Sequence, residues 1–419
     1  MSRNSGAPTP RTATPESVRE VNRSILLGLM RRYSPVSRAE LSRRSGIFPS
    51  NVSRIVEGLI AEGLLTERRA KPSGRGKVPM LLELRDEYFQ VVGIYVQPSE
   101  TMLAFAGFSG EIQKTWSIPT PADPQVFCGE VRRMLDVIRV EMKLGAKAIR
   151  HIGVGVPGFV DAAAGIITCV TTLPAYSGCP LARELERHTG IPVSIDNDCN
   201  LGALSELRRL ESHAEGAQSD FLFMSVGDYG VGAGLILRDQ LYRGHNACFA
   251  AEVGHIIMNP DGPRCSCGRT GCLETYISNA ATWNRYKPRT PFKSGRFREL
   301  LDAAANEEPR AVAAIQETAN YIALAATNIV TILNPAEIVL AGKITEAFPL
   351  IRRAVDTLYL SPYARVTLRR SWSAREVPLI HGAVCLAVSQ AINTPVFGMS
   401  ASFPRADIHR NEIDTSELE

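Results

Sequence analysis

Apolar residues recur at helical spacing near the start of the chain and predict three short helices. The first carries aliphatic side chains three or four residues apart, at Val18, Val21, Ile25 and Leu29. Ser37 and Glu40 have the spacing of a capping box, which starts the second helix, and Gly46 is expected to end it. The third begins near Pro49, and its inward side chains are expected to be Val52, Ile55, Val56, Leu59 and Ile60. Three short helices with a glycine-containing turn before the third are typical of a helix-turn-helix.

Two strand-like segments follow these helices and flank a basic loop. The strands are residues 64–69 and 78–84, and the loop between them reads AKPSGRGK. This pattern predicts the wing of a winged helix, in which Arg75 is suited to reach phosphates or the minor groove. The outward face of the third helix carries side-chain types that contact bases and phosphates: Ser50, Asn51, Ser53 and Arg54. We therefore predict a DNA-binding domain over residues 15–84, with a winged helix used only for protein contact as the alternative.

Beyond residue 85 the apolar pattern changes to short strands, and one arrangement of them occurs twice. A three-stranded meander is predicted at 91–96, 102–106 and 111–118, and again at 221–226, 231–237 and 240–243. Buried strands and helices follow each meander, including strands at 152–156 and 338–341 and a long helix at 311–333. The duplication predicts an α/β fold over residues 85–398, in which two mixed-sheet lobes enclose a cleft.

Charge is distributed unevenly along the 419 residues. Residues 1–80 hold 15 Lys and Arg against 6 Asp and Glu, whereas the rest holds 32 against 37. A basic head on a mildly acidic body indicates that the head binds a polyanion. Residues 1–14, rich in Ser, Thr, Pro and Arg, and residues 399–419 are expected to be tails. With no long apolar run and no secretory signal, the protein is expected to be cytoplasmic.

Three of the nine cysteines cluster beside a histidine. The spacing His255-x9-Cys265-x-Cys267-x4-Cys272 supplies the Cys3His set that Zn²⁺ takes in closed tetrahedral sites. A catalytic zinc is disfavoured, because four protein ligands leave no position for water. The spacing therefore predicts a structural zinc ion, with unrelated buried thiols beside a chance histidine as the alternative.

Four motifs of the body occur in a characteristic order: GVGVPGFVD at 153–161, IDNDCN at 195–200, AEVGH at 251–255 and CSCGRTGCLE at 265–274. In these motifs residues 85–395 resemble the ROK family (repressors, open reading frames, kinases). The winged helix in front is similar to that of the family's sugar-responsive repressors. The resemblance implies that the two lobes have the actin-like, ribonuclease-H-like fold.

The resemblance also implies a sugar site. In the family the zinc-binding cluster holds residues that bind sugar hydroxyls, which implies ligand-binding roles for Asn197, Asp198, Glu252, His255 and Glu274. Carboxylates and amides suit this role, because each sugar hydroxyl both donates and accepts hydrogen bonds. Asp198 matches the general base of the family's kinases. A role for Asp198 as the N-cap of the following helix is compatible with ligand binding.

The ATP half of the kinase site is altered in this chain. Family kinases carry DxGGTK on the first strand, where residues 95–100 read YVQPSE and place Glu100 at the lysine. Their second phosphate loop, GTGxG, reads GDYGVG at 227–232, with Asp228 as an added negative charge, and a later glycine pair reads AG at 341–342. Phosphoryl transfer depends on backbone amides and cations that neutralise phosphates. We therefore expect no catalytic residue and no enzymatic activity.

These patterns lead to one hypothesis and two alternatives. The hypothesis is a sugar-responsive DNA-binding transcriptional regulator, a repressor of carbohydrate-use genes, whose partners are operator DNA and a sugar or sugar-derivative effector. A homodimer or homotetramer is expected from the resemblance and from the two-fold symmetry of typical operators. The alternatives are an active ATP-dependent sugar kinase with an accessory DNA-binding domain, and a regulator whose effector is a phosphotransferase-system protein.

Overall fold

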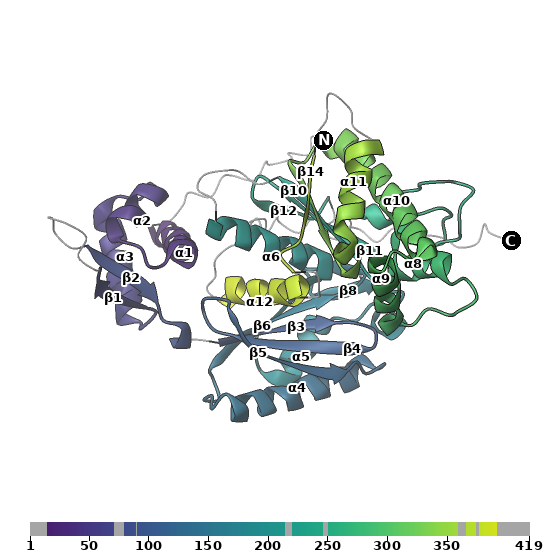
Figure 1. Cartoon of the computed structure of the whole chain (residues 1–419). Helices are drawn as coiled ribbons and strands as arrows, with labels where there is room; N and C mark the ends of the chain where they lie inside the picture. The colour runs from purple at the N-terminus through teal and green to yellow at the C-terminus, as the bar shows by residue number, and fades with distance from the viewer. Residues whose placement is uncertain are drawn as a thin grey trace, which may run out of the picture.

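The structure, a computed structural model, describes residues 15–70, 79–88, 90–213, 220–245, 250–358, 366–373 and 377–391. Residues 15–84, which we call the head, form a winged helix-turn-helix (Figure 1) of α1 (Pro15–Tyr33), α2 (Arg38–Ser45), α3 (Pro49–Ala61) and the antiparallel pair β1 (Leu65–Arg69) and β2 (Met80–Leu84). The Glu40 amide donates to Ser37 Oγ at 3.2 Å, and Gly46 ends α2 with a φ of 70°, as predicted. In a capping box the Glu40 carboxylate would also accept from the Ser37 backbone amide. Here it accepts from the side chains of Arg43 and Arg44 instead.

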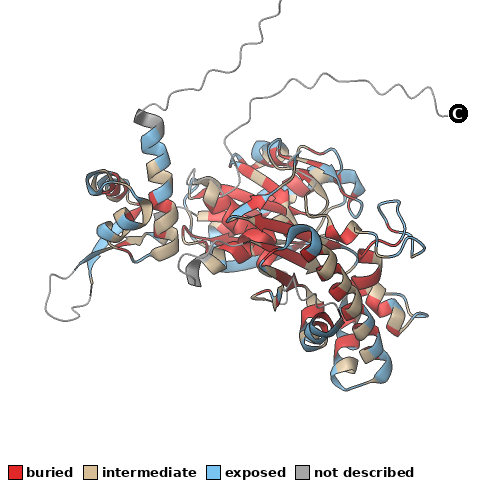
Figure 2. Cartoon of the chain, turned by 90° about the horizontal axis from the view of Figure 1, so that it is seen from above, coloured by how far each residue is buried: buried red, intermediate tan, exposed pale blue. Residues whose placement is uncertain are grey.

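The buried side of α1 differs from the predicted stripe. Leu26 and Met30 are at most 1% exposed, whereas Val18 and Val21 are 46% and 58% exposed. The reason is that the N-terminal half of α1 projects beyond the other helices of the head, as Figure 2 shows. The prediction for α3 is confirmed, because Val52, Ile55, Val56 and Leu59 are buried and Ile60 is partly buried against the same core.

Two five-stranded sheets with one topology form the rest of the described chain, residues 90–391, which we call the body. The first sheet contains β3 (Gln90–Val96), β4 (Glu100–Ala106), β5 (Ile112–Pro119), β6 (Ile149–Val156) and β9 (Val193–Asn197). The second contains β10 (Phe221–Val226), β11 (Val231–Leu237), β12 (Gln240–Tyr242), β13 (Glu337–Ala341) and β14 (Thr367–Arg370). Their orders, β5-β4-β3-β6-β9 and β12-β11-β10-β13-β14, each join an antiparallel meander to two parallel strands. The predicted duplication is confirmed.

Helices separate and cover the two sheets. α6 (Asp198–His213) and α12 (Val377–Ala391) lie between them, as Figure 1 shows. The approach of α12 to the first sheet is close, because a Cβ built on Gly153 would lie 2.1 Å from the Ala383 carbonyl oxygen. The outer helices are α4 (Pro124–Glu141) and α5 (Leu181–Thr189) on the first sheet, and α7 (Glu274–Ile277), α8 (Asn279–Tyr286), α9 (Phe297–Ala305), α10 (Pro309–Leu333) and α11 (Phe348–Leu358) on the second. A short hairpin, β7 (Phe159–Asp161) and β8 (Ile166–Cys169), extends the first lobe. Within the described ranges, every helix is too short or too polar to cross a membrane.

The head contacts the body through α6 and α12. The Arg208 guanidinium, on α6, donates to the backbone carbonyl of Arg31 near the end of α1. The Arg31 side chain in turn donates to Ser389 Oγ of α12 at 3.4 Å. The last carbonyls of a helix lack intrahelical partners, so Arg208 satisfies an acceptor that α1 cannot satisfy itself. Because α6 begins at Asp198, one helix joins the predicted ligand site to the head.

Candidate functional site

The predicted zinc ligands converge on one point. The ligand atoms of His255, Cys265, Cys267 and Cys272 all lie within 4.8 Å of one another. The Sγ atoms of Cys267 and Cys272 are 3.7 Å apart, and Cys265 Sγ is 3.6 Å from His255 Nδ1. In a tetrahedral site with Zn–S of about 2.3 Å and Zn–N of about 2.0 Å, these edges should be about 3.8 Å and about 3.5 Å. The donor set and its spacing therefore fit one tetrahedral metal ion.

The fold of the cysteine loop explains the convergence. The loop doubles back on itself through isolated bridges between Ile257 and Cys272 and between Arg264 and Thr270. Gly271 makes this possible, because a Cβ there would lie 1.6 Å from the Asn259 carbonyl oxygen and its φ is 68°. Any side chain at this position would separate the two halves of the loop and, with them, the ligands.

Three carboxyl groups from separate motifs meet beside the metal cluster. Glu252 precedes the short 3₁₀ helix Val253–His255, Asp198 starts α6, and Glu274 starts α7. Burial, and then the charges of Asp198 and Glu274, raise the pKa of Glu252 to about 7. The charges of Asp198 and Glu274 thus act on Glu252, although the three predicted sugar-binding carboxylates are far apart in the sequence.

Glu274 has a second role beside the predicted one. Its Oε1 atom accepts from Cys265 Sγ at 2.9 Å and from Ser266 Oγ at 3.1 Å, and lies 4.0 Å from His255 Nδ1. Its Oε2 atom would lie 3.8 Å from a Cβ built on Gly230, at the edge of the cleft. One oxygen of Glu274 is thus engaged with the metal-binding loop, and the other lies toward the cleft.

Asn197 caps α6, a role that the sequence left open for Asp198. Asn197 Oδ1 accepts from the backbone amides of Cys199 and Asn200 at 2.9 and 3.2 Å, and its Nδ2 donates to the Gly158 carbonyl at 2.9 Å. Asp198, the first residue of the helix, accepts from the Cys199 amide at 2.8 Å. Burial raises the pKa of Asp198 from 3.8 to about 6, an effect that the hydrogen bonds from Cys199 oppose. Asn197 therefore positions its neighbours, and Asp198 stands at the start of α6, where both the amide and the side chain of Cys199 bond to it.

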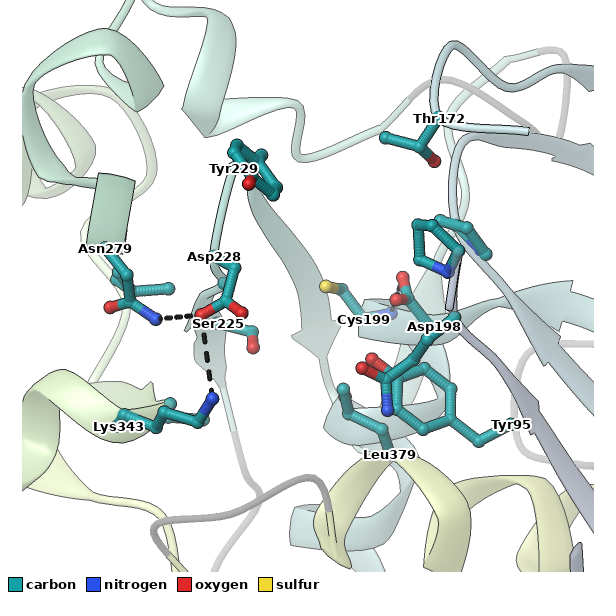
Figure 3. A pocket seen from close by; sticks show the side chains of 18 of the residues that line it. Tyr95, Thr172, Asp198, Cys199, Ser225, Asp228, Tyr229, Asn279, Lys343 and Leu379 are labelled. Atoms are coloured by element: carbon teal, nitrogen blue, oxygen red, sulfur yellow. Dashed lines mark hydrogen bonds and ion pairs between the residues drawn. The ribbon is translucent and has the colours of Figure 1, made fainter. Parts of the chain in front are cut away.

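A cavity of about 600 Å³ lies between the lobes at the carboxyl ends of the central strands. Figure 3 shows Asp198, Tyr95 and Leu379 on one side of it, and Asp228, Asn279 and Lys343 on the other. The segments that the sequence matched to ATP motifs line it, at 95–99, 227–230 and 341–342. Of the predicted ligand-binding residues only Asp198 lies on its wall. The cavity is thus the nucleotide half of the cleft, adjoining the proposed sugar half.

Two charges in the nucleotide half differ from the prediction. Glu100 is exposed at the start of β4 and is not among the residues that line the cavity. Asp228 does line it, but its carboxylate accepts from Asn279 Nδ2 at 2.8 Å and lies 3.6 Å from Lys343 Nζ. Neither partner of Asp228 was predicted from the sequence. Lys343 directly follows the third glycine pair and could have been noticed, whereas Asn279 is brought to Asp228 only by the fold.

The face of α3 that was predicted to contact DNA is open to solvent in the head. Ser50 and Arg54 are exposed, and Asn51 and Ser53 are half-buried. Arg54 donates to Asn51 Oδ1 at 3.1 Å, so the two side chains are held together on the surface. Phe48, at the start of the helix, is 76% exposed and was not singled out from the sequence. Arg75 lies outside the described residues.

Comparisons with known proteins agree with this architecture. The sequence model of the ROK family matches residues 91–379. The xylose repressor of Bacillus spizizenii is 27% identical over 392 residues, which cover 92% of this chain and 95% of the relative. The Escherichia coli DNA-binding transcriptional dual regulator NagC is 26% identical, over 81% of this chain and 84% of the relative.

Solved structures show the same fold in a regulator and in a kinase. A ROK family transcriptional regulator, a homologue of the E. coli MLC protein, superposes with a TM-score of 0.74 at 23% identity, covering 91% of this chain and 98% of its own. A ROK family glucokinase from Streptomyces griseus, in complex with glucose and AMPPNP, superposes with a TM-score of 0.61 at 21% identity. It covers 71% of this chain and 99% of its own. The fold of the body is therefore shared with both classes.

Proposed function

The chain belongs to the ROK family, and from this we propose that it is a DNA-binding transcriptional regulator, a repressor of carbohydrate-use genes that responds to a sugar. The observation that carries the proposal is the presence of the winged helix-turn-helix head in addition to the body. The regulator structure and the xylose repressor match over more than nine-tenths of this chain, whereas the whole glucokinase accounts for 71% of it. The basic charge of residues 1–80 and the open face of α3 support contact with operator DNA.

The body of this regulator is a sensor without kinase activity. The phosphate cradle of the family's kinases is altered in this cavity, because Pro98 offers no amide hydrogen and Asp228 adds a carboxylate where phosphates would lie. Asp198, Glu252, His255 and Glu274 bind the sugar, with Asn197 holding the start of α6. An active sugar kinase with an accessory head is the second candidate, which the intact Asp198 favours. ATP binding separates the two.

The metal of the cysteine loop is a structural Zn²⁺. The ligand set His255, Cys265, Cys267 and Cys272 fills all four positions of a tetrahedral ion, so the metal would supply rigidity and no activated water. By fixing the loop, it would place His255 and Glu274 at the cleft. We further propose a cytoplasmic homodimer or homotetramer, because two-fold operators are bound by two heads.

The DNA contacts can be tested in the head. Asn51→Ala should reduce the preference for the correct operator over a scrambled duplex by about 1–3 kcal/mol, because an amide reads base edges. Arg54→Ala should weaken binding to both duplexes. It should also reduce the slope of log affinity against log salt concentration by about one, the contribution of one phosphate contact. Fluorescence anisotropy at several salt concentrations measures both effects, with Arg139→Ala on α4 as the control. Unchanged DNA binding in both variants would show that α3 does not enter the groove.

Coupling between the sugar and DNA sites can be tested at α6. Arg208→Met removes the hydrogen bond to the α1 carbonyl while keeping the apolar part of the side chain. We expect nearly normal sugar affinity and an approximately tenfold smaller effect of the sugar on operator affinity. The reason is that the free energy of coupling between two sites is typically about 1–3 kcal/mol, and one hydrogen bond from a charged group is worth a comparable amount. Operator titrations with and without sugar give the ratio. The control is Arg187→Met on α5, which faces solvent in the body. An unchanged ratio in Arg208→Met would exclude α6 as the link.

A further inference from the structure

The residues that depart from the kinase ATP motifs give the nucleotide half of the cleft a different surface. Tyr229 is 62% exposed at the mouth of the cavity, and its ring meets Phe292 edge-on with centroids 5.5 Å apart. An aromatic ring that is exposed and yet held by a second ring offers a rigid apolar face. Figure 3 places Tyr229 across the cavity from Thr172.

Much of the remaining lining of the cavity is also apolar. This part comes from the central strands, the segments that follow them and the start of α12, and consists of Tyr95, Pro98, Pro157, Phe223, Pro378 and Leu379. Hydroxyls at Ser99, Thr172 and Ser225 interrupt this surface. Apolar walls with a few placed polar groups are the usual composition of a site that encloses an organic ligand.

The charges in the cavity disfavour an anionic ligand. Two carboxylates, Asp198 and Asp228, line it together with one cation, Lys343. Lys343 is 3.6 Å from Asp228, whose carboxylate Asn279 also holds, so the cation is already engaged by a neighbouring negative charge. A neutral ligand avoids the cost of bringing phosphate oxygens against these carboxylates.

The cavity adjoins the proposed sugar site without enclosing it. Asp198 is shared by the two, and Gly230 on the cavity wall lies beside Glu274 Oε2. Glu252 and His255 lie outside the lining. A volume of about 600 Å³ is therefore space beyond the sugar ring, and it lies within the range of sites that enclose drug-sized molecules.

From this geometry we infer that the effector is larger than one sugar ring: a neutral disaccharide or glycoside. One ring occupies the Asp198–Glu252–Glu274 site, and its substituent enters the former nucleotide half from the side of Asp198. The C–H face of the substituent lies on Tyr229, and its hydroxyls reach Ser99, Ser225 and the Asp228–Lys343 pair. This inference rests on the proposed sugar-sensing function of the same cleft and specifies the class of sugar.

The experiment compares matched ligands by calorimetry on the full-length, zinc-loaded protein. The probes are glucose, xylose and N-acetylglucosamine, the disaccharides cellobiose, gentiobiose, xylobiose and chitobiose, and the 6-phosphates of glucose and N-acetylglucosamine. At least one disaccharide should bind at least about tenfold more tightly than its parent monosaccharide. In Ser99→Trp, which fills the cavity from an exposed turn, and in Tyr229→Ala, that gain should fall to about twofold or less, with monosaccharide affinity unchanged.

The outcomes separate this inference from the proposed function. Monosaccharide binding without any gain for the disaccharides, or a gain that both variants retain, overturns the inference and leaves the sugar sensor intact. A 6-phosphate that binds at least tenfold more tightly than both its parent sugar and the disaccharides overturns the inference that the substituent is neutral. If none of the probes binds, both the inference and the sugar-sensing function fail.

Discussion

Cys267→Ser should release the metal, destabilise the body and abolish the response to sugar in a single substitution. Cys267 is the exposed member of the ligand set, so replacing its sulfur by oxygen costs little packing by itself. Structural zinc contributes several kcal/mol to folding, and each kcal/mol shifts the melting temperature of a domain of this size by roughly 2–4 °C. We expect less than a tenth of the wild-type zinc by elemental analysis, and a melting temperature at least about 5 °C lower.

The loss of function in this variant follows from the geometry of the loop. Without the ion, His255 and the loop whose Ser266 donates to Glu274 Oε1 are no longer fixed, and the carboxylates beside them lose their relative positions. DNA binding by the head should persist while sugar no longer changes it. The matched control is Cys169→Ser, an exposed free cysteine outside the loop, which should behave like the wild type. A zinc-free Cys267→Ser protein with a normal sugar response would refute the role given to the metal.

Asp198→Asn should weaken sugar binding without removing any enzymatic turnover. A hydroxyl that donates to a carboxylate forms a charged hydrogen bond, and its loss costs about 1–3 kcal/mol, which is roughly a 5- to 150-fold loss of affinity. The sugar concentration that changes operator binding should rise by the same factor. Calorimetry with sugar measures the loss of affinity, and calorimetry with ATP and Mg²⁺ tests for nucleotide binding. The control is Asp136→Asn, an exposed carboxylate on α4.

The wild-type protein itself supplies a second test of Asp198. Because burial raises the pKa of this carboxyl to about 6, the group is ionised above that pH and protonated below it. Sugar affinity should therefore fall as the pH decreases through about 6, and Asp198→Asn should lose this step while keeping the separate step that Glu252 contributes near pH 7. Micromolar ATP affinity, or phosphorylation of the bound sugar by ATP, would favour the kinase instead, and in a kinase Asp198→Asn would abolish turnover while largely keeping ligand binding.

Local sequence patterns determined the elements and the metal cluster. The period of the apolar residues predicted the helices of the head and both meanders of the body, because each pattern reports which side of an element is buried. The spacing of His255, Cys265, Cys267 and Cys272 predicted a joint site, since a short loop with two positive-φ glycines keeps these ligands within reach of one another. The motifs around Asp198 and the cysteine loop also pointed to the family.

Tertiary structure alone decided which side chains are free to act and which are engaged. Val18, Val21 and Ile25 of the predicted stripe of α1 are exposed, since their burial depends on which neighbours α1 reaches and not on its own period. Asn197 caps α6, and Asp228 is held by Asn279 and Lys343, two partners that lie 51 and 115 positions farther along the chain. Such contacts join segments that the fold brings together, and a local pattern carries no information about the distances between those segments. The sequence also predicted a cleft between the lobes, but the residues that line its nucleotide half and the contact of α6 with the head could be found only in three dimensions.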